Sequence, residues 1–219
     1  MIEQPSYLPE QIVIKKEHYA IVVLWLFQVS AIIGVLLGFQ GWFIEKTPLN
    51  LIIQVILLFW VFNLKNLKKA GLFLTLFAIG MTAEIVGVAT GFPFGEYGYG
   101  ANMGLKLMGV PLLIGCNWAV LVFCGATLAN RFFTNIWIKS VFGGVLMVLL
   151  DLPMEIVAPT FDFWEFVGQP PFENYFSWLI IGTIMHFILH SFKLKGNLSF
   201  SLHLYLAQFV FFATLAYFL

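Results

Sequence analysis

The chain has 219 residues, of which 61% are hydrophobic and only 10% are charged, and its formal net charge is zero. Soluble domains carry about 25% charged residues, so a chain this apolar cannot cover itself with polar surface and is predicted to be an integral membrane protein. The sparse, balanced charge also excludes the basic surface that binds nucleic acid, so no nucleic-acid partner is expected.

The first twenty residues contain three acids and two prolines before the first apolar run, which is not the pattern of a cleaved secretory signal. A transmembrane helix needs about 20 mostly apolar residues, and seven stretches qualify. They cover roughly residues 19–39, 48–64, 70–90, 108–130, 134–158, 174–192 and 200–219, and the second is the shortest. We therefore predict an all-α membrane bundle of about seven transmembrane helices, formed by residues 1–219 as a single integral membrane domain.

The basic residues are distributed unevenly among the connections between these stretches. The side that carries the N-terminus holds nine of them: Lys15, Lys16, Lys65, Lys68, Lys69, Arg131, Lys139, Lys193 and Lys195. The other side holds only Lys46 and Lys106. Because Lys and Arg concentrate in cytoplasmic loops, the N-terminus is predicted to be cytoplasmic. We expect a multi-pass protein in contact with lipid in the bacterial cytoplasmic membrane.

The two longest connections, about residues 91–107 and 159–173, both lie on the predicted outer side. The first is dense in glycine and aromatic residues, and the second carries Asp162, Glu165 and Glu173 without a basic residue. Glycines permit tight turns, and aromatic rings favour the membrane interface. These loops are interpreted either as a cap over the bundle or as plain interfacial belts.

Three acids inside the predicted helices need an explanation, because a charged side chain at the centre of a membrane helix costs about 2.5–3.5 kcal/mol on insertion scales. Glu84 lies in the third stretch, and Asp151 and Glu155 lie in the fifth. Glu84 precedes Gly91 by seven residues and Asp151 precedes Pro159 by eight, which places both roughly 10–12 Å below the outer ends of their helices. The matching depth predicts one polar pocket.

The spacing of Asp151 and Glu155, four residues apart, puts both on one helix face. Pro153 lies between them and frees the carbonyl one turn earlier, near Leu149. A buried carboxyl that keeps its proton is a general acid, and an ionised neighbour can orient water. The alternative is that the three acids only form hydrogen bonds that hold the helices together.

Other polar residues give weaker indications. Asn117 could line the same pocket. His186 and His190 share a helix face but lie near the cytoplasmic end, where an interface pair is more common than a metal site. Cys116 and Cys124 are interpreted as packing residues.

The sequence has no HExxH, GxGxxG or P-loop motif, so neither a metal nor another cofactor is expected.

The stretch from Glu84 to Tyr99, EIVGVATGFPFGEYGY, is followed by Gly109-Val-Pro and then by Asn117-Trp118. The fifth stretch contains Asp-Leu-Pro-Met-Glu at 151–155, and beyond it come the pair Phe163-Trp164 and the segment NYFSW at 174–178. Together these motifs resemble the carotenoid biosynthesis membrane protein family, which includes CruF-type carotenoid 1′,2′-hydratases and bisanhydrobacterioruberin hydratase. Ile156 stands where that family has a proline.

The resemblance implies that water is added to the terminal double bond of a linear or monocyclic carotenoid of the lycopene or γ-carotene type. It implies a carotenoid substrate and other enzymes of the pathway as partners. The expected catalytic set is Glu84, Asp151 and Glu155, with Asp151 as the proton donor and Glu84 placing water. The expected substrate-binding residues are Thr90, Phe92, Phe94, Tyr97, Asn117, Trp118, Phe163, Trp164, Asn174 and Tyr175.

Two other functions remain open from the residues alone. Acids within the membrane and a broken helix are also typical of proton-coupled transporters, although no inverted repeat is visible. A non-catalytic pigment-binding protein could use the same aromatic residues to hold a polyene.

Overall fold

The computed structural model describes residues 15–218. Within this range, seven segments are helical, long enough and apolar enough to cross a membrane, which confirms the predicted all-α bundle. The helices are α1 (Lys16–Leu36), α2 (Gln40–Ile44), α3 (Thr47–Phe62), α4 (Leu67–Thr90), α5 (Leu112–Phe132), α6 (Ile136–Val157), α7 (Phe172–Ser191) and α8 (Leu198–Phe218). The second membrane-crossing segment combines α2 and α3.

The ends of the first two predicted spans are the largest difference from the sequence analysis. The first helix was expected to reach residue 39, but α1 ends at Leu36, and the chain turns at Gly38 in a left-handed conformation (φ 90°). The five-residue helix α2 follows, and α3 begins with a proline in its first turn. Apolar composition continues through this break, so composition alone could not locate it.

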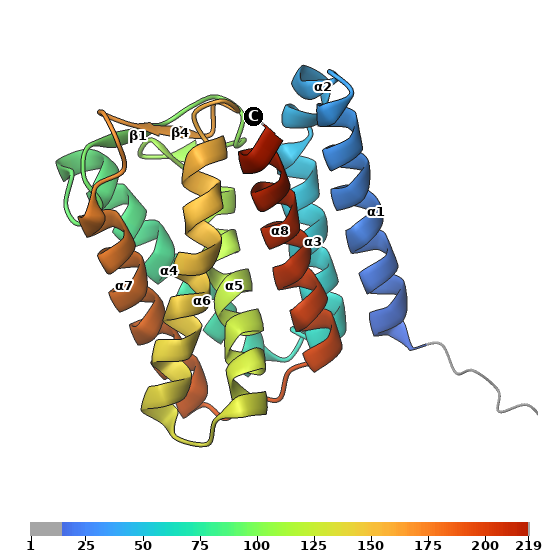
Figure 1. The fold of residues 1–219 in the computed structure, drawn as a ribbon. Helices are drawn as coiled ribbons and strands as arrows, with labels where there is room; N and C mark the ends of the chain where they lie inside the picture. The colour runs from blue at the N-terminus through green and yellow to red at the C-terminus, as the bar shows by residue number, and fades with distance from the viewer. Residues whose placement is uncertain (1–14, 219) are drawn as a thin grey trace, which may run out of the picture.

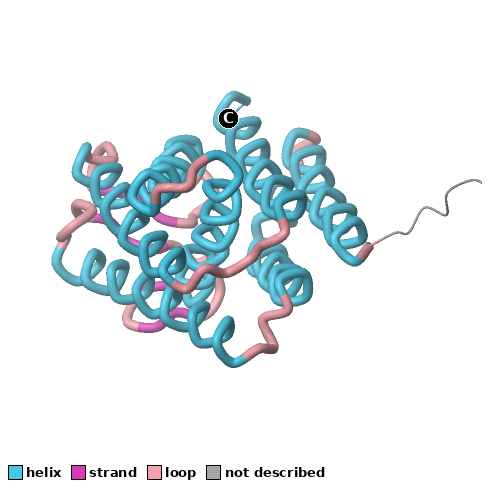
Figure 2. Tube along the Cα trace, turned by 90° about the horizontal axis from the view of Figure 1, so that it is seen from below, coloured by secondary structure: helices cyan, strands magenta, loops and turns pink. Residues whose placement is uncertain are grey.

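Helix α5 is the centre of the bundle. It packs against α3, α4, α6, α7 and α8. The view from below shows the helices of the bundle close to end-on, packed side by side (Figure 2). In its most apolar stretch 83% of the residues are buried, against 28–50% in the other six spans. A helix that is apolar on all sides belongs in such a position. α5 therefore presents side chains to the carboxyl-bearing helices on one side and to α3 and α8 on the other.

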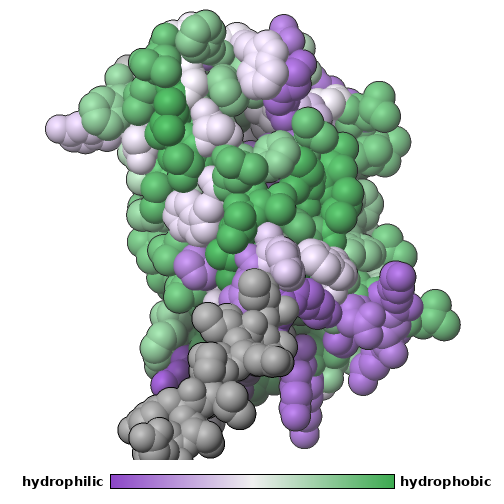
Figure 3. Space-filling model, turned by 90° about the vertical axis from the view of Figure 1, so that its right-hand side faces the viewer, coloured by the Kyte–Doolittle hydropathy of each residue, from purple (hydrophilic) through white to green (hydrophobic). Residues whose placement is uncertain are grey.

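The outside of the bundle is apolar where lipid would contact it. Large hydrophobic side chains of α1, among them Val22, Leu26 and Ile33, are exposed. On the face that carries α1, hydrophobic residues form a broad band, and hydrophilic residues gather mainly below it (Figure 3). This surface is the one expected of a protein whose solvent is a bilayer.

The two long connections meet at one end of the bundle (Figure 1). Strand β1 (Tyr97–Tyr99) of the first pairs antiparallel with β4 (Trp164–Phe166) of the second, with Tyr99 opposite Trp164. The first connection also contains a small hairpin of β2 (Lys106–Leu107) and β3 (Val110–Pro111), which leads into α5. A cap was one of the two interpretations of these loops, and their pairing as strands was not predicted.

A carboxylate in the loop fastens the two connections together. The carboxylate of Asp162 accepts a hydrogen bond of 2.7 Å from the backbone N–H of Ala101, and the carbonyl of Phe163 accepts one of 2.9 Å from Gly100. At the start of this cap, Gly91 ends α4 in a left-handed conformation (φ 75°), which glycine adopts without steric cost. The chain therefore turns back over the last turns of α4, which carry Glu84 further inside the bundle.

Candidate active site

The three carboxyl groups lie inside the bundle at the end capped by the paired strands. The exposed fractions are 3% for Glu84, 0% for Asp151 and 7% for Glu155. Glu84 on α4 and Glu155 on α6 line one cavity. Asp151 lies one helical turn from Glu155 on α6 and is not among the residues that line the cavity. Glu84 and Glu155 thus converge on one cavity, whereas Asp151, which was also expected to line it, lies behind Glu155.

Glu84 accepts three hydrogen bonds. The hydroxyls of Tyr97 and Tyr99 donate to Oε2 at 2.5 Å and 2.8 Å, and the indole N–H of Trp118 donates to Oε1 at 2.9 Å. Residues two apart on a strand point to the same face, so β1 delivers both hydroxyls to one carboxyl oxygen. Three donors and no acceptor are the surroundings that suit a carboxylate.

The two tyrosines remain donors at any physiological pH. Burial, followed by the negative charge of Glu84, raises the pKa of Tyr97 and of Tyr99 well above the ordinary value of 10.0. Both causes disfavour the phenolate, because it would be a second negative charge in an apolar setting. The O–H groups therefore stay available to Glu84.

Asp151 and Glu155 share a donor on the neighbouring helix. The side-chain amide of Asn174, at the start of α7, donates to Asp151 Oδ2 at 3.1 Å and to Glu155 Oε1 at 3.0 Å. The indole N–H of Trp164 donates to Glu155 Oε2 at 2.9 Å. Asp151 Oδ1 is buried and has no hydrogen-bond partner among residues 15–218. A carboxyl oxygen in that position is best suited to carrying a proton.

The site holds its carboxyls without counter-ions. Within the described part of the chain, the only ion pair joins Glu45 and Lys46, both at the surface, with 3.8 Å between Lys46 Nζ and Glu45 Oε2. Phenol, indole and amide groups take the place of a lysine or arginine. The carboxyls are therefore oriented without being fixed as ionised partners of a base.

The cavity between Glu84 and Glu155 has a volume of about 20 Å³, which is room for about one water molecule. Aromatic rings form most of its wall. Those of Trp118 and Trp178 are stacked, with centroids 4.0 Å apart. The complete lining is Glu84, Phe94, Tyr97, Tyr99, Ile114, Asn117, Trp118, Met154, Glu155, Trp164, Phe166, Asn174 and Trp178.

The structure brings six of the ten expected binding residues to this cavity: Phe94, Tyr97, Asn117, Trp118, Trp164 and Asn174. Phe163 lines an adjoining cavity instead. Thr90, Phe92 and Tyr175 do not line either. The hydroxyl of Thr90 donates to the carbonyl of Val86 in its own helix, and Phe92 is 75% exposed.

Five residues of the lining were not expected: Tyr99, Ile114, Met154, Phe166 and Trp178. Tyr99 was within reach of sequence reasoning, since the alternation Tyr-Gly-Tyr is that of a strand with one aromatic face. Trp178 lies one turn after Asn174 on α7, so the same helix-face argument applies to it. The other three come to the cavity only through the arrangement of the whole bundle.

The histidine pair lies away from the acids, in the second half of α7, and His190 is in its last turn. Nδ1 of His186 is 2.7 Å from the carbonyl oxygen of Gly182. Among residues 15–218, no group of three or more His, Cys, Asp or Glu side chains is arranged to hold a metal ion. The side chains that line the carboxyl cavity supply two carboxyl groups, two amides and a wall of aromatic rings.

The comparisons with known proteins agree with the motifs. The family profile described as "Carotenoid biosynthesis protein" matches residues 46–219. The chain belongs to this family. A curated relative, the bisanhydrobacterioruberin hydratase of Haloarcula japonica, is 33% identical over 135 residues, which cover 53% of this chain and 43% of the relative. The alignment thus spans less than half of that relative, and no solved structure matches the chain.

Family membership and the seven apolar helices together identify an integral, multi-pass membrane protein of carotenoid biosynthesis. The family match begins at residue 46, so it includes every helix that contributes a carboxyl group or a donor to the site.

Proposed function

We propose that this protein is a carotenoid hydratase, a lyase that adds water to the terminal 1′,2′ double bond of a linear or monocyclic carotenoid of the lycopene or γ-carotene type. The observation that carries the proposal is the placement of Glu84 and Glu155 on one aromatic-walled cavity with room for about one water. The family and the name of the relative point to the same reaction class.

The reaction requires a proton donor, a water molecule and a proton acceptor. The donor's O–H bond breaks as the proton adds to the less substituted carbon of the double bond, and the π electrons leave a tertiary carbocation at the other carbon. The oxygen of water bonds to that cation, and a carboxylate removes the surplus proton. Return of this proton to the donor restores the site, so the net change is the addition of one water.

In this proposal the Asp151–Glu155 pair holds the reacting proton, and Glu155 delivers it because Glu155 is the member that lines the cavity. Asp151, behind it, shares the Asn174 amide and supports the protonated pair. This differs from the expectation that Asp151 donates directly. Glu84, with three donors and no acceptor, is the base that orients water and accepts its proton.

The aromatic wall supplies the remaining requirement, which is stabilisation of the carbocation. The face of an aromatic ring attracts a cation, by about 2 kcal/mol or more where water is excluded. Trp118 and Trp178 line the cavity as a stacked pair, and Trp164 and Tyr97 line it as well. The N–H of Trp118 and that of Trp164 hold the two carboxyls, so their rings are positioned by the groups that react.

We place the protein in the bacterial cytoplasmic membrane with its N-terminus in the cytoplasm. The basic connections favour this orientation. The site would then lie beneath the outer face, under the β1–β4 cap, where water is near and a lipid-dissolved substrate can still reach it.

The test is expression in a host that accumulates lycopene or γ-carotene, followed by separation of the pigments and mass measurement. We expect a product heavier than the substrate by one water, and we expect Glu84→Gln and Glu155→Gln to abolish it. Glu165→Gln is the matched control, because Glu165 is an exposed acid of β4 and does not line the cavity.

A well-inserted protein that yields no hydrated pigment contradicts the proposal. Pigment that co-purifies at unchanged mass indicates a carotenoid-binding protein instead. Equal turnover in Glu84→Gln, Glu155→Gln and Glu165→Gln removes the two acids from the mechanism.

A further inference from the structure

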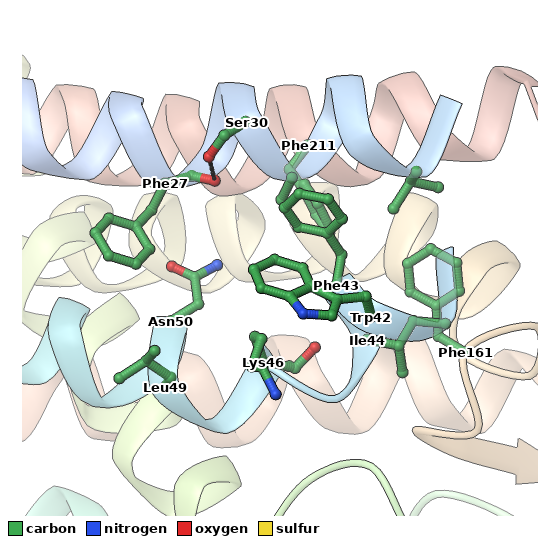
Figure 4. Close-up of a pocket in the computed structure, with 13 residues that line it drawn as sticks. Phe27, Ser30, Trp42, Phe43, Ile44, Lys46, Leu49, Asn50, Phe161 and Phe211 are labelled. Atoms are coloured by element: carbon green, nitrogen blue, oxygen red, sulfur yellow. Dashed lines mark hydrogen bonds between the residues drawn. The ribbon is translucent and has the colours of Figure 1, made fainter. Parts of the chain in front are cut away.

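A larger apolar groove lies on the other side of α5, where α1, α2 and α3 meet. Its volume is about 210 Å³. Figure 4 shows the rings of Phe27, Trp42, Phe43 and Phe211 gathered around it, with Asn50 reaching in from α3. The full lining is Phe27, Ser30, Ala31, Val35, Trp42, Phe43, Ile44, Lys46, Thr47, Leu49, Asn50, Phe161 and Phe211.

The groove opens to the outside of the bundle. Ser30 of α1, Trp42 of α2 and Leu49 of α3 are all exposed while they line it. Trp42 and Lys46 lie at its mouth, with Lys46 Nζ 5.6 Å from the centre of the indole ring. Trp42 belongs to α2, which lies at the end of the bundle that carries the β1–β4 cap (Figure 1). The groove is therefore open to the surroundings of the bundle near its capped end.

A small cavity adjoins the groove on its inner side. This intermediate cavity has a volume of about 40 Å³, and it shares Thr47, Asn50 and Phe211 with the groove. Where one side chain lines two spaces, only that side chain lies between them at that point. The groove and the intermediate cavity are thus neighbours, divided by these shared side chains.

The intermediate cavity adjoins the carboxyl cavity in the same way. The two share Ile114, Asn117, Met154 and Trp164. Trp164 is the residue whose indole N–H holds Glu155. Met154 is one of the separating side chains, and its flexible thioether chain rearranges easily. Three spaces therefore follow one another from the lipid-facing groove to the two carboxyls.

Five amide side chains line the intermediate cavity, and hydrogen bonds join them to one another. Nδ2 of Asn50 donates to Gln28, and Nε2 of Gln54 donates to Asn50. Nε2 of Gln208 donates to Gln54 at 2.6 Å and to Asn117 at 3.0 Å. These four hydrogen bonds pair most of the amide groups with each other, but the buried Oε1 of Gln208 has no hydrogen-bond partner among residues 15–218. Most of the other residues that line the groove and the intermediate cavity are apolar, which suits a hydrocarbon chain.

We propose that this groove binds the polyene chain of the carotenoid and is the lateral entrance through which its end reaches the carboxyls. The proposal rests on the proposed function. The carboxyl cavity holds about one water, so it can receive only the reacting end group after side chains move, and the long remainder must lie elsewhere. A groove walled by rings and leading to the acids suits a conjugated chain better than a lipid acyl chain.

Two pairs of variants test the groove, each with a control on the same helix. Leu49→Trp fills the groove from α3, and Ile52→Trp places the same ring on an exposed position of α3 that lines none of the three spaces. Ala31→Phe fills it from α1, with Val29→Phe as its control. Insertion is verified by the amount of monodisperse protein recovered in detergent.

Two readouts are measured on all four variants, carotenoid hydration in membranes and the polyene that co-purifies per protein. We expect Leu49→Trp and Ala31→Phe to raise KM about tenfold or more with kcat kept, since losing the burial of even two methylene groups has that effect. Their retained polyene should fall by a similar factor. The controls should match the parent.

The outcomes separate this proposal from the proposed function. If the filled variants match their controls in both readouts, or if the groove retains phospholipid while the polyene is unaffected, the groove is not the polyene site. If the parent hydrates no carotenoid yet retains polyene that Leu49→Trp and Ala31→Phe release, the hydratase function fails and the binding groove stands.

Discussion

Gly87 on α4 permits Tyr97 to reach Glu84, and its replacement by alanine is the sharpest test of the site. A Cβ atom built at Gly87 would lie 2.7 Å from Phe94 Cδ2 and 2.7 Å from the Tyr97 hydroxyl oxygen. Atoms do not approach so closely, so the ring must move away. The Tyr97–Glu84 hydrogen bond of 2.5 Å would then be broken. Gly71 on the same helix has no such neighbour within 4 Å.

Replacement by alanine is expected to change folding stability in opposite directions at the two glycines. Alanine in place of glycine within a helix stabilises by about 0.5–1 kcal/mol, which is the whole effect expected for Gly71→Ala. At Gly87, overpacking costs about 1–3 kcal/mol and a lost hydrogen bond to a carboxylate about 1.5–3 kcal/mol. Gly87→Ala should therefore lower the melting temperature in detergent, and turnover should fall roughly 10- to 150-fold because Glu84 loses a donor.

The assay is pigment hydration per inserted protein, combined with thermal unfolding of the purified protein. Tyr97→Phe removes the hydroxyl without crowding and should lose comparable activity. In the double variant, Gly87→Ala should cost little further activity, because the contact that it breaks is already absent. Full activity in Gly87→Ala, with a melting temperature as high as that of Gly71→Ala, would refute the placement of Tyr97 at Glu84.

Three further predictions concern the donors and the amide chain. Asn174→Leu removes the amide shared by two buried carboxyls, so turnover should fall at least about tenfold in the pigment assay, and unchanged turnover would contradict its role. Because the pKa values of Tyr97 and Tyr99 are raised by folding, their contribution to stability is complete below their ordinary pKa of 10.0 and is lost above it. Unfolding free energy should fall by up to about 1.4 kcal/mol per pH unit per tyrosine in that range, and less in the phenylalanine variants. Gln208→Leu removes the donor of two hydrogen bonds, which are worth about 0.6–1.7 kcal/mol each within membranes, and thermal unfolding should register the loss.

The sequence predicted well the features that depend only on the composition of a segment or on spacing along one helix. Seven runs of apolar residues predicted seven spans, because length and apolarity are properties of each segment alone. The depth of Glu84 and the shared face of Asp151 and Glu155 follow from the rise and period of a helix. These arguments need no knowledge of the neighbouring helices, which explains why they agree with the structure.

The features that were missed depend on contacts between distant segments. The three-residue strands β1 and β4 are too short for a periodic signal, and their pairing joins residues more than sixty positions apart. Asp151 was expected to face the substrate, yet the cavity reaches α6 only at Met154 and Glu155, and Asp151 lies one helical turn deeper on the same face as Glu155. How deep the cavity extends along α6 depends on packing against α5 and α7, which no local pattern records.

The choice of hydrogen-bond donors connects the fold to the chemistry. Lysine or arginine would stabilise three acids in the membrane at the lowest free-energy cost. A permanent cation, however, keeps its carboxylate ionised, so no proton remains for an alkene. Here Glu84 receives donors from two phenols and an indole, and Glu155 receives them from an indole and an amide. Such neutral donors orient a carboxyl in either protonation state more readily than a cation does. A lysine introduced beside Glu155, as in Met154→Lys, should therefore preserve insertion by pairing with the acid while abolishing hydration, and retained turnover in that variant would argue against Glu155 as the proton donor.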